Sequence, residues 1–63
     1  MHPTTHAPLN LSAGELAILS ELLEADRNRL LVEIRHTHHR AYRDELRARL
    51  TVVESLAERC RSN

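Results

Sequence analysis

The stretch EIRHTHHRAYRDEL, from Glu33 to Leu46, decides the fold of this 63-residue chain. On either side of it, apolar residues recur every three or four positions, which is the spacing of an amphipathic helix. At about 100° per residue, the second apolar row is rotated by roughly 100° from the first, so one straight helix would not present a single seam. The histidines and the threonine of HTHHR, residues 36–40, are weak helix formers. We therefore expect the chain to reverse direction here, giving an all-α antiparallel hairpin of two helices.

The two apolar rows set the expected boundaries of the hairpin. Residues 1–11 contain two prolines and show no apolar period, so we expect them to form a flexible tail. Within a helical hairpin over residues 12–63, we expect a first helix at about 12–36, a turn at about 37–39 and a second helix at about 40–61.

The beginning of the first helix carries a specific signal. Ser12 is a preferred N-cap residue, and Glu15 three positions later completes a capping box. Leu11 before the cap and Leu16 after it can pack together as a hydrophobic staple. Thr37 is the corresponding candidate cap for the second helix.

Folding the chain back near His38 brings together residues whose numbers add up to 75 or 76. Apolar residues then meet apolar residues, and the two charged interruptions, Asp26 and Arg49, also meet. By the same rule Glu33 falls opposite Arg43. The Asp26–Arg49 pair is either an exposed ion pair of little energetic effect or an ionic layer that fixes the register. The predicted intramolecular seam consists of Leu16, Leu19, Leu23, Asp26, Leu30, Ile34, Tyr42, Leu46, Arg49, Val53, Leu56 and Cys60.

More apolar residues remain than one seam can bury. A contiguous exposed patch of this kind usually marks an interface, and the simplest solution is a dimer of hairpins that forms a four-helix bundle. A second copy is the favoured partner, and a different protein is the alternative. The predicted interface consists of Ile18, Leu22, Ala25, Val32, Leu50 and Ala57.

Composition excludes several classes of protein. The chain allows one small domain, and its single cysteine, Cys60, excludes an internal disulfide framework. The most apolar window, residues 16–23, is interrupted by Ser20 and Glu21, so no membrane span is expected. No phosphate loop or pair of catalytic carboxylates is present, so we expect neither an enzyme nor a cofactor. A lone thiol fits a reducing compartment, and we expect the cytoplasm.

Three histidines of the turn region, His36, His38 and His39, are candidate metal ligands because imidazole is the commonest one. Closely spaced histidines on a turn do not fix a tetrahedral site, however, and they are equally explained as solvated turn residues. A specific metal site is therefore not expected, and a metal-responsive module ranks third among the possible functions.

Arginines are concentrated in the same region, at Arg35, Arg40, Arg43 and Arg47, and arginine-rich ends can contact phosphates. The formal net charge of the chain is zero, however, and the acidic first helix can neutralise the basic second helix across the hairpin. A non-enzymatic interaction or adaptor module is thus the favoured function. A small nucleic-acid-binding regulator is the alternative.

The segment EIRHT at 33–37, followed by YR at 42–43, Leu46 and Arg49, resembles the pattern E-I-x-x-T-x-x-x-x-Y-R-x-x-L-x-x-R of short, uncharacterised bacterial helical-hairpin proteins. In those proteins an acidic residue often follows the threonine and helps to cap the second helix, whereas this chain has His38. The resemblance implies a bacterial helical hairpin. It carries no activity, so no functional residue comes with it.

Overall fold

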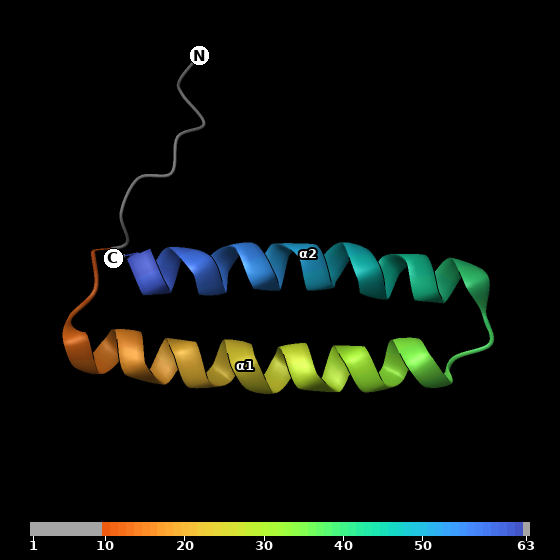
Figure 1. Ribbon diagram of the computed structural model, residues 1–63, viewed down its shortest axis with the longest axis horizontal. Helices are drawn as coiled ribbons and strands as arrows, with labels where there is room; N and C mark the ends of the chain where they lie inside the picture. Colours follow the sequence, from red (N-terminus) through yellow and green to blue (C-terminus); the bar gives the residue numbers. More distant parts are fainter. Residues whose placement is uncertain (1–9, 63) are drawn as a thin grey trace, which may run out of the picture.

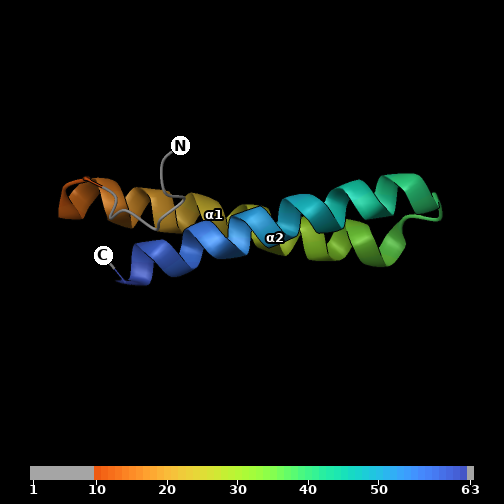
Figure 2. The same ribbon diagram turned by 90° about the horizontal axis from the view of Figure 1, so that it is seen from above.

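The computed structural model describes residues 10–62, and these form an all-α hairpin of two antiparallel helices (Figure 1). Helix α1 spans Ala13–His36 and helix α2 spans Arg40–Ser62. No strand occurs between residues 10 and 62, so the predicted all-helical hairpin is confirmed. Seen from above, the two helices cross at a shallow angle (Figure 2). Of the tail predicted at 1–11, residues 1–9 lie outside the described residues.

Helix α1 begins with a complete capping box. The backbone N–H of Glu15 donates to Ser12 Oγ at 3.1 Å, and the backbone N–H of Ser12 donates to Glu15 Oε1 at 2.9 Å. These two bonds satisfy backbone donors that the first turn of a helix leaves without intrahelical partners. The negative carboxylate of Glu15 also lies at the positive end of the helix dipole.

The turn between the helices is held by Thr37. Its backbone N–H donates to Glu33 O at 2.9 Å and its backbone is extended, so Thr37 ends α1 rather than capping α2 as predicted. Thr37 Oγ1 accepts a hydrogen bond from the N–H of His39 at 3.3 Å. The first hydrogen bond of α2 runs from Arg43 N to His39 O, and Arg43 Nη2 reaches back to Thr37 O at 3.1 Å. Arg43 thereby links the first turn of α2 to the residue that ends α1.

The core lies between the helices, and each helix contributes two buried residues that are seven positions apart. Leu23 and Leu30 are buried on α1, and Leu46 and Val53 are buried on α2. Leu30 is fully buried, with 0% of its surface exposed. The half-buried residues that pack against these four are Leu19, Ile34, Leu50, Leu56, Ala57 and Cys60.

Several predicted positions differ from the structure. Leu50 and Ala57, expected at an interface between copies, pack instead against the core of their own hairpin. Tyr42, expected in the seam, is 47% exposed. Leu16 is half-buried and lies outside the core cluster.

Within the described part of the chain, neither helix has the length and apolar character that a membrane crossing requires.

Candidate interaction faces

The hairpin has two faces, one on either side of the plane that contains both helix axes. Asp26 contacts Arg49 on one side, and the next residue, Arg27, contacts Glu54 on the other. This separation follows from helix geometry, because consecutive residues are turned by about 100°. We call these surfaces the Asp26 face and the Arg27 face.

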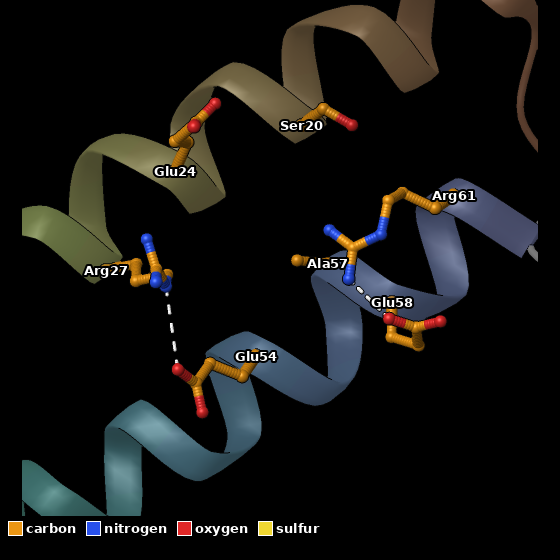
Figure 3. A pocket seen from close by; sticks show the side chains of 7 residues that line it. All are labelled: Ser20, Glu24, Arg27, Glu54, Ala57, Glu58 and Arg61. Carbon is orange, nitrogen blue, oxygen red and sulfur yellow. Dashed lines mark hydrogen bonds and ion pairs between the residues drawn. The ribbon is translucent and has the colours of Figure 1, made fainter.

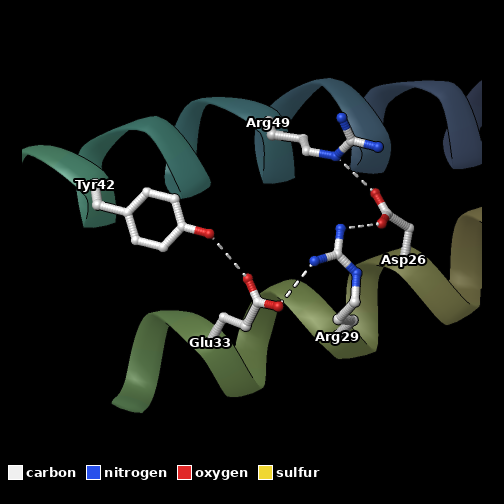
Figure 4. A network of polar contacts seen from close by, with 5 residues as sticks. All are labelled: Asp26, Arg29, Glu33, Tyr42 and Arg49. Atoms are coloured by element: carbon white, nitrogen blue, oxygen red, sulfur yellow. Dashed lines mark hydrogen bonds and ion pairs between the residues drawn. The ribbon is translucent and has the colours of Figure 1, made fainter. Parts of the chain in front are cut away.

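A chain of charged and polar groups, linked by hydrogen bonds, occupies the turn-side half of the Asp26 face (Figure 4). Asp26 accepts hydrogen bonds from Arg49 Nε at 2.9 Å and from Arg29 Nη2 at 2.7 Å. Arg29 Nη1 donates to Glu33 Oε2 at 2.9 Å, and the Tyr42 hydroxyl donates to Glu33 Oε1 at 3.5 Å. Two of these four bonds cross between the helices, so the network joins α1 to α2.

The network perturbs the ionisation of its central members. The hydrogen bond from Arg29, followed by that from Arg49, holds the pKa of the Asp26 carboxyl below its ordinary value. The hydrogen bond to Asp26, followed by that to Glu33, raises the pKa of the Arg29 guanidinium. Both groups are therefore fixed in their charged forms, which suits a structural ion-pair network and not a proton-transferring site.

The half of the Asp26 face nearer the termini carries several exposed apolar side chains. Leu22 precedes Asp26 by four residues, and Val52 follows Arg49 by three. Because the helices are antiparallel, both steps lead one turn from the ion pair toward the termini, on the same side of the hairpin. Leu22 is 63% exposed, Val52 58%, and Ile18, one turn further along α1, 61%. Large apolar side chains of both helices thus stand in water on one surface.

Val52 was not identified from the sequence. Its position is recoverable from the Asp26–Arg49 pair, because residues three positions apart on a helix share a side. On α1 the exposed row continues through Ala25 to Val32, which is also exposed.

The Arg27 face is polar (Figure 3). Arg27 Nε lies 3.5 Å from Glu54 Oε2, and Arg61 pairs with Glu58 one turn further along α2. A shallow groove with a volume of about 570 Å³ runs between the helices here. The residues that line it are Ser20, Glu24, Arg27, Glu54, Ala57, Glu58 and Arg61. Charges of both signs alternate around this groove, so the groove itself offers no large apolar docking surface.

The residues of the turn end are not assembled into a metal site. His36, His38 and His39 are all exposed, and no group of three potential ligands surrounds one point within residues 10–62. Arg43 is half-buried and bonded to Thr37 O, whereas the arginines at 35, 40 and 47 are exposed.

No family model matches this sequence, and no curated protein or solved structure shows significant similarity to it. Function is therefore inferred from the two faces and from the turn end.

Proposed function

We propose that this protein is a non-enzymatic interaction module whose partner is a second copy of itself. Two hairpins join through their Asp26 faces and form a four-helix bundle. The observation that supports this is the exposure of Ile18, Leu22 and Val52 on one surface. Each of these side chains would lose apolar contact with water in such a dimer, which is the main driving force of association.

The spacing on α1 favours a helical partner. Leu23 and Leu30 face α2, whereas Ile18, Ala25 and Val32 repeat on another side of the helix at the same seven-residue interval. A helix with two heptad rows packs against two neighbouring helices, as each helix of a four-helix bundle does.

The charges favour a second copy as the occupant. An antiparallel, two-fold arrangement centred on Leu22 sets Glu15 of one copy level with Arg29 of the other, and does so twice. These are opposite charges on exposed residues, and each would add a contact to those it already makes within its own hairpin, Glu15 with Ser12 and Arg29 with Asp26 and Glu33. The zero net charge of the chain also adds no overall repulsion between copies.

The oligomeric state tests this proposal. Sedimentation equilibrium should give a mass of about twice the 7.3 kDa of the chain, and Ile18→Gln should shift it toward the monomer. Ala17→Gln is the matched control, because Ala17 is exposed but turned by about 100° from Ile18, away from the Asp26 face. A folded monomer at every concentration would contradict the proposal, and so would equal effects of the two variants.

We further propose that the protein works in a reducing compartment, and specifically in the cytoplasm. Cys60 is the only cysteine, and its side chain packs against the core of the hairpin. A thiol in this position serves as a small apolar residue, which persists most readily where disulfides do not form.

A further inference from the structure

Three arginines at the turn end have no partner among the described residues. Their side chains make no ion pair or hydrogen bond within residues 10–62, and all three are exposed. Most other arginines are engaged: four pair with carboxylates and one with a backbone carbonyl. The three without a partner are Arg35, Arg40 and Arg47.

These three arginines share one face. Arg40, Arg47 and Glu54 follow one another at seven-residue steps, so they lie along one side of α2, which Glu54 marks as the Arg27 face. Arg35 comes eight residues after Arg27 on α1, which turns it by roughly 80°, further from the seam on the same face. Arg35 lies at the same distance from the turn as Arg40, because their numbers add up to 75. The three guanidinium groups thus gather where the Arg27 face meets the turn.

Neutralisation across the hairpin does not account for them. The sequence predicts that acidic residues of α1 balance basic residues of α2. Arg49 is used in this way, by Asp26, but Arg40 and Arg47 have no such partner within residues 10–62. The contact on the Arg27 face runs in the opposite sense, because α1 supplies the arginine and α2 the carboxylate, Glu54. The one acid on the same side of α2 near the cluster is Asp44, which is exposed and forms no ion pair there.

We propose that Arg35, Arg40 and Arg47 form a binding surface for the phosphate backbone of a nucleic-acid duplex. A guanidinium group binds a phosphate through parallel N–H donors, and these three need not break an ion pair first. Three positive charges against the single carboxylate of Asp44 leave the surface positive although the whole chain is neutral.

The surroundings favour a duplex over other polyanions. Membrane binding would need a broad apolar surface beside the charges. Val32 and the half-buried Leu31 lie within one turn of Arg35, but Ile18 and Leu22 lie toward the other end of the hairpin and on its other face. Single strands are held mainly by stacking on Phe, Tyr or Trp, and the one such residue of the chain, Tyr42, is bonded to Glu33 on the Asp26 face. Contacts confined to phosphates position a protein without reading sequence, so the binding is not sequence-specific.

The salt dependence of binding tests the proposal. The probe is a short, fluorescently labelled DNA duplex of mixed sequence, followed by anisotropy over a series of salt concentrations. Contact with three phosphates should give a slope of about −2.7 in log K against log salt, since each contributes about −0.9. Arg47→Gln should reduce the slope by about one unit, and the triple Gln variant of Arg35, Arg40 and Arg47 should abolish binding. Asp44→Asn should strengthen binding.

The matched control is Arg61→Gln. Arg61 continues the seven-residue row of Arg40, Arg47 and Glu54, but it lies at the opposite end of α2 and pairs with Glu58. The Arg61→Gln variant loses one positive charge on the same side of α2 as Arg47→Gln does. An unchanged slope of log K against log salt for Arg61→Gln therefore supports a binding site at the turn end. Circular dichroism checks that every variant keeps its helical content.

Three results would overturn the proposal. The first is an absence of duplex binding at low salt. The second is an Arg61→Gln variant that loses as much slope as Arg47→Gln, which would mean that binding follows net charge. The third is binding to phosphatidylserine vesicles without binding to the duplex, which would place the protein on membranes.

Discussion

Arg49 Nε lies 2.9 Å from Asp26 Oδ2, although 23 residues separate the two side chains in sequence. This hydrogen bond joins the two helices near their middle, between the buried pairs Leu23–Val53 and Leu30–Leu46. The second oxygen of Asp26 is occupied by Arg29, so the carboxylate is satisfied on both sides. A slip of the helices by one turn would separate Asp26 from Arg49 and leave a charge at the edge of the core, which favours the observed register.

A double-mutant cycle tests whether the contact between Asp26 and Arg49 contributes to the free energy of unfolding. Asp26→Asn and Arg49→Gln should each destabilise the hairpin, but the double variant should lose less than the sum, because either change alone already removes the charge attraction of the same ion pair. The measurement is urea unfolding followed by circular dichroism. Arg49→Gln combined with Glu54→Gln is the control pair: Glu54 contacts Arg27 on the other face, so these losses should add. Additive losses for the first pair as well would mean that Asp26 and Arg49 do not interact in solution.

Acid should weaken the hairpin through the same carboxylate. Hydrogen bonds from Arg29 and then Arg49 hold the folded-state pKa of Asp26 below its ordinary 3.8, so the folded protein binds this proton less tightly than the unfolded chain. The resulting stabilisation is complete above about pH 4 and is lost as the pH falls through the lower, folded-state pKa. We therefore expect the urea midpoint of the wild type to fall more steeply on acidification than that of Asp26→Asn. Parallel curves would show that Asp26 does not contribute.

The level of each residue along the hairpin could be predicted from sequence, but its face could not. The pairing rule aligns Asp26 with Arg49 and also Glu33 with Arg43. In the structure Glu33 lies on the Asp26 face, bonded to Arg29, whereas Arg43 turns to the backbone of Thr37. A sum of residue numbers records the distance from the turn and carries no information about rotation around the helix. Rotation has to be taken from the apolar rows and the step of about 100° per residue.

The sequence also did not predict which residues beside the two apolar rows pack between the helices. Leu50 and Ala57 lie one turn from the buried Leu46 and Val53, and two helices that cross at a shallow angle enclose such flanking side chains. Tyr42 is the opposite case: it lies in the first turn of α2, where its hydroxyl bonds to Glu33 and its ring stays partly in water. A tyrosine has an apolar ring and a polar hydroxyl, which suit both the seam and the surface, so the residue type alone did not predict the position of Tyr42.

Truncation of the core should be the most damaging single change. Leu30 is the one fully buried side chain among the described residues, so Leu30→Ala should cost about 2–5 kcal/mol of unfolding free energy. That is a large share of the stability of so small a core, and a mostly unfolded protein at room temperature is expected. Val52→Ala removes an exposed side chain and, in dilute solution, should change stability by no more than about 0.5 kcal/mol. Equal losses from the two changes would mean that the core is not centred on Leu30.

The capping box should stabilise the hairpin from its free end. Ser12→Ala removes the oxygen that accepts from Glu15 N and should cost about 1 kcal/mol, with faster amide hydrogen exchange confined to the first turn of α1. Glu15→Gln should retain most of the stability, because a glutamine oxygen can still accept the bond from Ser12 N. Ser55→Ala is the control: Ser55 is exposed within α2, where alanine is the better helix former, so stability should stay level or rise. If Ser12→Ala proved as harmless as Ser55→Ala, the capping box would contribute nothing, and α1 would depend on its contacts with α2 alone.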